Sequence, residues 1–530
     1  MIRQKLFRVV GSVVVVVVAG FTVQLGAEPV EGQLDLLTHA EIDALAERAM
    51  ERFQTPGIAI GVVSDGELVY AKGHGVLEIG KPETVDADTI FQIASVTKAF
   101  TAAALGILAD EGKLGFDDPV IDHLPEYRMS DPWVTREFTI RDLLTHRSGL
   151  PLGAGDLLFW PKAETTRQEV VEALRHLEPE TSFRTAYAYD NLLYIVAGEV
   201  VATVSGMPWE DFVEERILGP LGMDGCRALP SRVAGNLNRA TPHMLVDGDL
   251  VTTFFSEDGA ASAAGGINCN VTGLAKWVAM HLAGGALPNG ERLLSEETHA
   301  ELFKPVTLMS VGEVDREHGR SHFAAYALGW RLKDFHGYLH EGHSGGLQGM
   351  TCHLALLPEL DVAAIALTNQ WSRASRAVTS EILQSAVSSS VEDWVEIYSG
   401  DASDEAEEAR KTVEEMFAGR NAESTPSLEL AAYAGTYRDP WYGDVFVEWD
   451  GDSLVMRFSR SELLTGDLEH FQYDTFVARW RDRSLHADAF VSFRLGADGE
   501  VESIDMKAVS PDTDFSYDFH DLDLHHVKER

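Results

Sequence analysis

The sequence predicts a mixed α/β sandwich, with helices on both sides of a sheet, followed by a separate all-β barrel. Two observations predict the sandwich: strands that neighbour one another in hairpins, and helical segments around them without regular βαβ alternation. A third observation predicts the barrel: in roughly the last hundred residues, apolar residues alternate between Asp-Gly turns. At 530 residues, 45% of them apolar, the chain is long enough for two or three units with buried cores.

The sandwich opens with a helix and a hairpin. A capping box from Thr38 to Glu41 begins a helix predicted over residues 39–53, in which apolar residues recur at helical spacing. Two apolar runs, Ile58–Val63 and Leu68–Ala71, follow on either side of a Ser-Asp-Gly-Glu turn. They predict a β-hairpin.

A second predicted helix, from Ser95 to about Glu111, is apolar on most sides, so we expect it to lie buried at the centre of the fold. Later in this domain, Leu354–Leu357 and Val362–Thr368 predict paired strands. Further helices are predicted over residues 139–146, 166–176, 190–205 and 208–217.

The composition changes between the two predicted domains. A Ser-rich stretch leads into an acidic run, Asp401–Glu408, which we interpret as part of a linker that carries one solvated helix. Beyond Leu428 the pattern is all-β. The predicted boundaries are a signal segment at 1–27, the sandwich domain at 34–390, an acidic linker at 391–427 and an antiparallel β-barrel at 428–530.

The formal net charge of −41 excludes two classes of partner. Nucleic acids and anionic membrane surfaces would be repelled by so acidic a chain, so we expect neither as a partner. The three cysteines, Cys226, Cys269 and Cys352, form no disulfide framework and no spacing typical of a structural metal site. We expect buried, inert cysteines and, unless pairing is intermolecular, at least one free thiol.

The first 27 residues have the pattern of a secretory signal. Basic residues precede an apolar run from Val9 to about Val23, and Gly26-Ala27 stands before the acidic Glu28. Leu25 occupies a position where a small residue is usual for cleavage after Ala27, so an uncleaved single-pass anchor is the alternative. In both cases we expect the body of the protein to be exported, to the periplasm or the cell exterior.

Ser95-Val96-Thr97-Lys98 stands at the start of the buried helix. Positions three apart share a helix face, so the Lys98 amine can reach the Ser95 hydroxyl. A serine at a helix N-terminus also has a backbone N–H and the helix dipole beside it, which favour a developing oxyanion. One Ser-x-x-Lys pair is expected by chance, but an ammonium in an apolar helix is costly to bury without a function. The motif therefore predicts a nucleophile, Ser95, and its proton partner, Lys98.

Two further motifs have simpler interpretations when taken alone. Tyr189-Asp190-Asn191 precedes a helical run, so Asp190 or Asn191 can be a helix N-cap. His343-Ser344-Gly345-Gly346 stands just before an apolar strand and is typical of a turn.

The three motifs together, in this order, resemble the signature set of the penicillin-recognising serine enzymes: Ser-x-x-Lys, Tyr-x-Asn and a Lys/His-x-Gly triplet. The chain is similar to the branch that contains class C β-lactamases, D,D-carboxypeptidases, D-aminopeptidases and related esterases. The resemblance covers roughly residues 35–385, and the last domain resembles the lipocalin-like barrel that some members carry. Other matching stretches are Phe91–Ser95, Leu143–Leu150, Pro220–Met223, Ala264–Gly266 and Leu328–Trp330.

The resemblance implies a β-lactamase-like three-layer sandwich, with a central antiparallel sheet flanked by helices, and it implies roles for the motif residues. Ser95 would form an acyl-enzyme, Lys98 would accept the Ser95 proton directly or through Tyr189, and Tyr189 would relay it to the leaving group. No metal or other cofactor is implied. The other implied site residues are Asn191, His343, Ser344 and Gly345 for substrate binding, and the N–H groups of Ser95 and Gly346 for the oxyanion hole.

His343 departs from the β-lactamase pattern, which has Lys at this position. Lys gives a permanent positive charge toward a substrate carboxylate, whereas His gives it only in part at pH 7. We therefore expect a serine hydrolase that cleaves esters or peptides, with D-amino-acid peptides as the leading substrates. A β-lactamase or D,D-carboxypeptidase is the first alternative, and a non-catalytic penicillin-binding or sensor protein is the second.

The expected partner is a small-molecule or peptide substrate. Membrane contact is expected only through a retained N-terminal anchor, and the oligomeric state is left open. We expect the loop Gly153–Pro161 to help shape the substrate pocket, with Phe159-Trp160 as a wall. We expect the barrel to limit access to the active site rather than to take part in the chemistry; the alternative is a barrel that only stabilises or tethers the enzyme.

Overall fold

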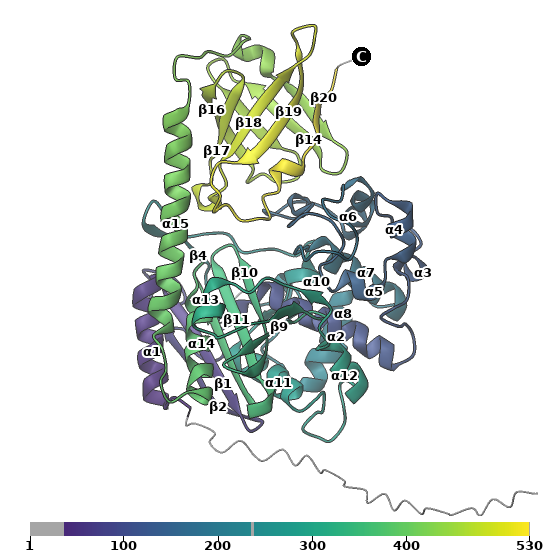
Figure 1. Cartoon of the computed structure of the whole chain (residues 1–530), viewed down its shortest axis with the longest axis vertical. Coiled ribbons are helices and arrows are strands. Elements are labelled where there is room, and N and C mark those ends of the chain that lie inside the picture. The colour runs from purple at the N-terminus through teal and green to yellow at the C-terminus, as the bar shows by residue number, and fades with distance from the viewer. Residues whose placement is uncertain (1–35, 235–237, 529–530) are drawn as a thin grey trace, which may run out of the picture. The chain divides into compact units, whose positions relative to one another are not determined.

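The computed structural model of the protein describes residues 36–234 and 238–528, so the predicted signal segment at 1–27 lies outside the described residues. Its larger domain is built on an antiparallel sheet of eight strands, in the order β2-β1-β12-β11-β10-β9-β8-β7 (Figure 1). The strands are β1 Gly57–Ser64, β2 Glu67–Gly75, β7 Thr307–Leu308, β8 Ala324–Tyr326, β9 Arg331–Phe335, β10 Tyr338–Leu347, β11 Met350–Leu357 and β12 Val362–Thr368.

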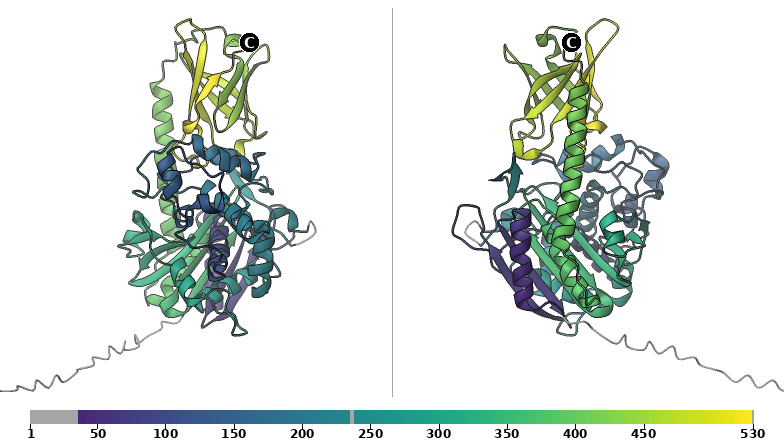
Figure 2. Two further views of the ribbon diagram at one scale, coloured as in Figure 1. Left: turned by 90° about the vertical axis from the view of Figure 1, so that its right-hand side faces the viewer. Right: turned by 60° about the vertical axis from the view of Figure 1, so that its left-hand side comes forward.

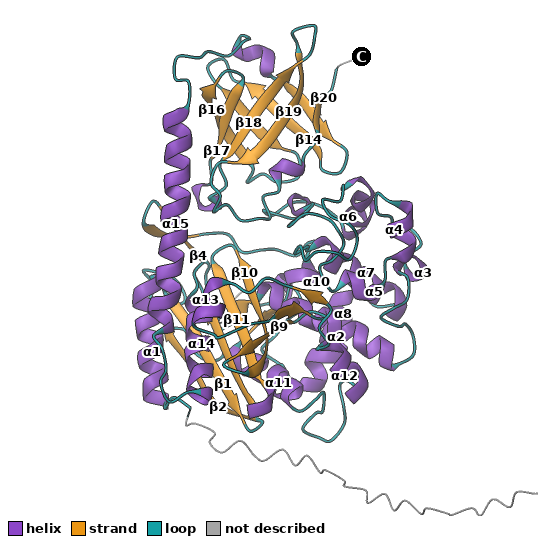
Figure 3. Ribbon diagram, viewed as in Figure 1, coloured by secondary structure: helices purple, strands orange, loops and turns teal. Residues whose placement is uncertain are grey.

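Helices cover both faces of this sheet (Figure 3). α1 (His39–Phe53), α14 (Ala374–Val387) and the start of α15 (Trp394–Gly419) share one core with alternate residues of β1, such as Ile60. The intervening residues of β1, such as Val63, belong to the opposite core, with α2 (Thr97–Asp110) and α11 (Val271–Leu282). Because both faces are covered, β1 and β12 are buried along their whole length. The predicted three-layer sandwich is confirmed.

The serine motif lies at a bend rather than inside the helix. Residues Ala94–Val96 form a 3-10 turn, and α2 begins at Thr97, two residues after the predicted start. Ala94 has a φ of 48°, in the left-handed region that L-residues other than Asn and Asp rarely adopt. Residues Thr97 to Leu108 of α2 are all buried, Lys98 among them. This helix is therefore buried within the fold, as predicted.

The remaining predicted helices are present but shorter than expected. α7 (Leu192–Ser205) is the longest of them and packs against α2. The others are α5 Ile140–Leu143, α6 Arg167–Ala173 and α8 Trp209–Val213. A 3-10 turn, Leu174–His176, continues α6, and a π-helical turn, Glu214–Leu218, continues α8.

Two of the three cysteines are bonded to each other, where three buried, inert cysteines were expected; the expected free thiol is present. Cys226 and Cys269 form a disulfide, while Cys352 is free and buried. The two partners lie 43 positions apart in the sequence. They meet because Arg227 and Asn268 exchange two backbone hydrogen bonds, at 2.8 and 2.9 Å, next to the bonded cysteines. This pairing has no local signature.

The C-terminal domain is a closed antiparallel barrel in which eight strands follow one another in chain order. Its interior is filled by aromatic side chains, among them Tyr433, Tyr437 and Phe476. The predicted barrel is confirmed. Its strands are β13 Gly435–Asp439, β14 Gly443–Trp449, β15 Leu454–Phe458, β16 Thr465–Gln472, β17 Thr475–Trp480, β18 Ala489–Leu495, β19 Val501–Ala508 and β20 Leu524–His526.

A single helix of 26 residues, α15, occupies most of the segment predicted to be a linker (Figure 2). Its first turns bury Trp394 and Tyr398 against the sandwich. Its last turns place Met416 and Phe417 against the barrel residue Phe471. The acidic middle is exposed, as expected of a solvated helix. Within the described residues no single helix is long and apolar enough to cross a membrane; only the bent pair Leu192–Ser205 and Trp209–Leu221 passes by length and composition.

Candidate active site

The Lys98 amine lies among three oxygen atoms at the centre of the sandwich. Its Nζ is 2.7 Å from Asn191 Oδ1, 3.0 Å from the Ala264 carbonyl oxygen and 3.2 Å from Ser95 Oγ. The first two atoms can only accept, so they take two N–H bonds of the amine. In the neutral amine the third direction, toward Ser95, is left for the lone pair. The structure therefore brings Ser95, Lys98 and Asn191 together.

Burial sets the protonation of Lys98. It lowers the pKa of Lys98 from its ordinary value to about 7, although the nearby Asp156 opposes this shift. Arg331 lowers the pKa of Lys98 further. Near pH 7 a large fraction of this amine is therefore neutral and able to accept a proton.

Tyr189 lies over the same amine. Its ring centroid is 4.9 Å from Lys98 Nζ and 4.2 Å from that of the His146 ring, and the residue is 7% exposed. Burial raises the pKa of Tyr189 well above its ordinary value, and a hydrogen bond with Ser95 only partly offsets this. Tyr189 therefore stays protonated at neutral pH, so Lys98 is the better proton acceptor of the two.

Asn191 and Asp190, the two polar residues that end the second motif, bind different partners. The Asn191 side chain accepts from Lys98 and donates from Nδ2 to Asp156 Oδ2 at 2.7 Å, which leaves one amide N–H free for another acceptor. Asp190 Oδ1 accepts from the Leu193 N–H at 3.4 Å, at the start of α7. The helix-capping interpretation therefore applies to Asp190, whose pKa burial raises to about 7.

His343, on β10, is buried and hydrogen-bonded within the protein. Its Nδ1 lies 2.6 Å from the Ser344 carbonyl oxygen, and its Nε2 lies 2.9 Å from Tyr326 Oη. Since a carbonyl only accepts, Nδ1 carries the hydrogen and Nε2 accepts from the Tyr326 hydroxyl. Burial and the charge of Arg331 lower the pKa of His343 well below its ordinary value. The imidazole is therefore neutral, with both nitrogens occupied.

The glycines after His343 let β10 pass directly against the turn that carries Ser95. A Cβ atom at Gly345 would collide with the Ile93 carbonyl oxygen, and one at Gly346 would lie 2.9 Å from the Trp371 ring. Close approach of the backbone is what a glycine permits here. Ser344 Oγ lies 2.9 Å from Arg376 Nη2, which donates to it. The third motif is thus a strand, not the isolated turn that it resembles by itself.

Arg331, which sequence analysis missed, lies among three tyrosine rings at the site. Its guanidinium carbon is 5.5 Å from the Tyr189 ring centroid, 5.8 Å from that of Tyr326 and 5.9 Å from that of Tyr187. No ion pair joins Arg331 to a carboxylate of the described residues. Its position just after the matching stretch Leu328–Trp330 was the signal that could have found it.

The C-terminal domain also reaches this site, through residues that sequence analysis missed. Ser516 Oγ donates to Asp156 Oδ2 at 2.8 Å, and the Phe515 ring meets the Tyr189 ring edge-on at 5.9 Å between centroids. Trp160, expected to form a wall, packs against Tyr517. No local pattern links positions 156 and 516, which lie 360 residues apart.

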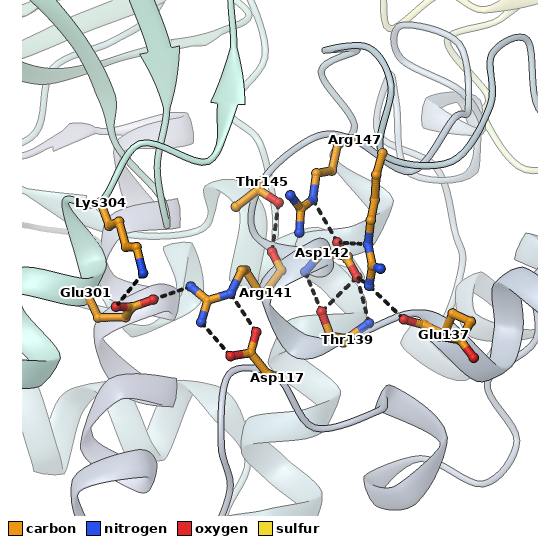
Figure 4. A network of polar contacts seen from close by, with 10 residues as sticks. Asp117, Glu137, Thr139, Arg141, Asp142, Thr145, Arg147, Glu301 and Lys304 are labelled. Carbon is orange, nitrogen blue, oxygen red and sulfur yellow. Dashed lines mark hydrogen bonds and ion pairs between the residues drawn. The ribbon is translucent and has the colours of Figure 1, made fainter. Parts of the chain in front are cut away.

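A buried carboxylate, Asp142, stands just before the stretch Leu143–Leu150 and binds neighbouring segments together (Figure 4). Asp142 accepts from Arg147 Nε at 2.8 Å, from Arg184 Nη2 at 2.6 Å and from the Thr139 N–H at 2.9 Å. These bonds hold the pKa of Asp142 below its ordinary value, although burial alone would raise it. The network fixes the segment that carries His146, whose Nδ1 accepts from the Asp190 N–H at 3.1 Å.

The site opens into a cavity of about 2720 Å³, lined by residues of both domains. Ser95, Tyr189, Asn191 and His343 line it, together with Phe515. Its lining also includes Arg48 and Val413, so the volume is that of a long groove of which the part beside Ser95 is only one section. Within the described ranges no three His, Cys, Asp or Glu side chains are grouped so that they would hold a metal ion.

The chain resembles known proteins in family, sequence and structure. Residues 42–388 match the family described as Beta-lactamase, and residues 419–526 match a domain described as being of unknown function, DUF3471. The chain is 27% identical over 484 residues to the unguisins hydrolase ungD′ of Aspergillus campestris, and the match covers 86% of each chain. It is 29% identical over 335 residues to penicillin-binding protein 4 of Amycolatopsis lactamdurans, covering 62% of this chain and 85% of that one.

Solved structures share the fold at low identity. The octameric penicillin-binding protein homologue from Pyrococcus abyssi aligns over 92% of this chain and 100% of its own, with a TM-score of 0.61 and 22% identity. The structure described as SurE aligns over 92% of this chain and 99% of its own, with a TM-score of 0.52 and 19% identity. These likenesses extend over both domains of the chain.

Proposed function

The chain is a member of the Beta-lactamase family of serine hydrolases, and on this premise we propose that it cleaves peptide bonds, those of D-amino-acid peptides first, or ester bonds, through an acyl-enzyme on Ser95. The observation that carries the proposal is the Lys98 amine, which is buried, has a pKa near 7 and lies 3.2 Å from Ser95 Oγ. Such an amine is matched to proton transfer at neutral pH.

In the proposed reaction, Lys98 accepts the Ser95 proton while Ser95 Oγ attacks the acyl carbon. The N–H groups of Ser95 and Gly346 receive the oxyanion, and the free N–H of Asn191 donates to the substrate amide. The proton passes from Lys98 through the Tyr189 hydroxyl to the leaving amine or alcohol. A water molecule then attacks the acyl-enzyme, again with Lys98 as base, and regenerates Ser95.

One observation favours peptides or esters over β-lactams. His343 is neutral and hydrogen-bonded on both nitrogens, so it offers no charge to a substrate carboxylate. A relative of similar length is named as a hydrolase of unguisins, which agrees with a hydrolytic activity here.

The test is a fluorophosphonate label followed by a substrate panel. We expect the label on the Ser95 peptide by mass spectrometry and turnover of ester or D-aminoacyl chromogens. Nitrocefin as the best substrate would favour the β-lactamase alternative. Labelling by fluorescent penicillin without turnover of any substrate would favour the penicillin-binding alternative. One relative is named as a penicillin-binding protein.

We also propose that the protein is exported, to the periplasm or the cell exterior. The disulfide between Cys226 and Cys269 supports this, because such bonds persist in oxidising compartments. The basic and apolar segment at 1–27 is the proposed signal or, uncleaved, an anchor. Cell fractionation and the N-terminal mass of the mature protein test it: a cytosolic, full-length product with reduced cysteines would contradict export.

A further inference from the structure

A loop of the barrel, residues 509–523 between β19 and β20, contributes directly to the active site. Phe515 packs edge-on against Tyr189, and its carbonyl oxygen lies so close to Gly153 that a Cβ atom there would be 2.6 Å away. Gly153 has a φ of 74°, which favours glycine in any case. The loop therefore contacts both the second motif and the turn that precedes Asp156.

A line of buried hydrogen bonds runs from this loop to the proposed base. Ser516 Oγ donates to Asp156 Oδ2 at 2.8 Å, and Asn191 Nδ2 donates to the same oxygen at 2.7 Å. Asn191 Oδ1 then accepts from Lys98 Nζ at 2.7 Å. Each of the four side chains is at most 7% exposed. No catalytic motif includes Asp156 or Ser516.

A second residue of the loop fixes the backbone around Asp156. The Asp518 carboxylate accepts from the Gly155 N–H at 2.6 Å and from the Leu157 N–H at 3.0 Å. These two donors begin the 3-10 turn Asp156–Leu158. Asp156 is therefore held through its backbone by Asp518 and through its carboxylate by Ser516, and both contacts come from the barrel domain.

The orientation of the Asn191 amide depends on this arrangement. An amide turned by 180° would present its NH₂ group to the Lys98 amine and its oxygen to the Asp156 carboxylate, so both contacts would lose a hydrogen bond. An acceptor at Asp156 therefore selects the orientation in which Asn191 Oδ1 binds Lys98. In that orientation the Lys98 lone pair faces Ser95 Oγ.

We propose that Ser516 is a positioning residue of the active site: by holding Asp156, it fixes the Asn191 amide and thereby aims the Lys98 amine at Ser95. The barrel is then part of the machinery rather than only a boundary of the cavity. The inference rests on the proposed serine hydrolase function for its kinetic consequences, but the hydrogen-bonded line itself is independent of the substrate.

The charges around Lys98 determine the expected direction of change. Burial raises the pKa of Asp156 well above its ordinary value, and the hydrogen bonds from Asn191 and Ser516 oppose this shift by favouring the ionised form. The charge of ionised Asp156 in turn raises the pKa of Lys98. Removal of the Ser516 hydroxyl should therefore lower the pKa of Lys98. The other titratable or charged groups that face Lys98 are Asp190, Arg331, His146, His343, Tyr189 and Tyr194.

The experiment compares Ser516→Ala with Ser461→Ala in the full-length protein. Ser461 is also a buried serine of the barrel domain, and it donates to the Pro161 carbonyl oxygen of the sandwich, a hydrogen bond that does not belong to the line leading to Lys98. For Ser516→Ala we expect kcat/KM at the pH optimum to fall about tenfold, as for the loss of one buried hydrogen bond. The acid limb of the pH profile should move to lower pH. Ser461→Ala should change neither, and Ser516→Thr should restore both.

A titration that needs no turnover completes the test. In protein labelled with ¹³C at lysine Cε, the Lys98 signal is assigned by its absence in Lys98→Met. Its pKa should be lower in Ser516→Ala and lower still in Asp156→Asn, which keeps the shape of Asp156 but removes its charge. An unchanged Lys98 pKa in both variants, or equal kinetic losses in Ser516→Ala and Ser461→Ala, would overturn the inference. Absence of labelling and hydrolysis in the wild type would instead refute the proposed function, and the titration would still decide this inference.

Discussion

The barrel interior and the active-site cavity both bury many polar side chains, but they satisfy them differently. In the barrel, Tyr437 Oη donates to the Tyr433 carbonyl oxygen at 2.8 Å and Trp480 Nε1 donates to that of Ala487 at 2.6 Å. Among the described residues, no buried side-chain nitrogen or oxygen of β13 to β19 lacks a hydrogen-bond partner. At the active site, Asp156 Oδ1, Asp190 Oδ2 and Arg331 Nε lack one.

This difference separates stability from function. Buried polar atoms without partners are unfavourable for folding, so the polar groups beside Lys98 are less completely bonded than those of the barrel strands. The strands β13 to β19 of the barrel are therefore expected to lose stability but not catalysis when one of their internal hydrogen bonds is removed, unlike the loop 509–523. The following predictions test the contrast, from the largest expected effect to the smallest.

Ser95→Ala should reduce hydrolysis by at least about a thousandfold, because it removes the nucleophile at almost no packing cost. Its circular dichroism and unfolding midpoint should match those of the wild type. The assay is turnover of the best panel substrate, with an acylating inhibitor and mass spectrometry to locate the adduct. An adduct on another serine, or retained activity, would disprove the assignment of Ser95.

Lys98→Met should also reduce turnover by about a thousandfold, because no other group accepts the Ser95 proton. Unlike a barrel variant, it should be more stable than the wild type at pH 7, by about 2 kcal/mol, since a buried amine is replaced by an apolar side chain. Urea unfolding measures this. A destabilised variant would mean that the hydrogen bonds to Asn191 and Ala264 outweigh the cost of burying the amine.

The same variant has a predicted pH dependence. The pKa of Lys98 is about 7 in the folded protein and near 10.5 when unfolded, so the unfolded state binds more protons between these values. Wild-type stability should therefore rise with pH across this window, and the advantage of Lys98→Met should shrink toward pH 10.5. In the wild type, kcat/KM should rise through pH 7 as Lys98 loses its proton.

Substrate preference tests the neutral state of His343. Ester or D-aminoacyl turnover should exceed cephalosporin turnover by at least tenfold in kcat/KM, about 1.4 kcal/mol, since His343 offers no permanent charge to a carboxylate. A panel of chromogenic substrates at equal enzyme concentration measures the ratio. If nitrocefin is the best of them, the other basic groups of the cavity supply the charge that His343 lacks.

Tyr437→Phe, a variant of the barrel interior, should have the smallest effect on activity and is the control for the active-site variants. It removes the hydrogen bond to the Tyr433 carbonyl without changing the ring, so we expect a loss of about 1 kcal/mol in the free energy of unfolding. kcat/KM should stay within twofold of the wild type. A larger kinetic loss would show that the barrel interior, and not only the loop 509–523, is coupled to the site.

Features set by neighbouring residues could be predicted from the sequence. Ser95 and Lys98 lie within one turn of each other, and the capping box at Thr38 begins α1. The strands in which apolar and polar residues alternate form the closed barrel. Their periodicity and spacing act locally, so they are present in the sequence itself. The helix predicted to start at Ser95 starts at Thr97, because the backbone bends at Ala94. The positive φ of Ala94 could not be predicted, since alanine is not a residue that favours this conformation.

Features set by contacts distant in the sequence could not be predicted. Asp156 and Ser516 are ordinary loop residues until the barrel brings position 516 to position 156. The Cys226–Cys269 bond likewise depends on a backbone pairing formed only in the folded chain. Arg331 follows a matched stretch of sequence, but its surroundings are known only from the fold. Tyrosine rings surround its guanidinium group, and no carboxylate of the described residues forms an ion pair with it.

Because α15 is a helix, it limits how the connection between the two domains can change in length over evolution. A flexible tether accepts inserted or deleted residues, but each residue added to a helix advances it by 1.5 Å and turns everything beyond it by about 100°. Met416 and Phe417 would then leave the barrel surface that they contact. Homologues that change the length of this helix should therefore do so in whole turns, or exchange the barrel and its helical arm as one inherited block.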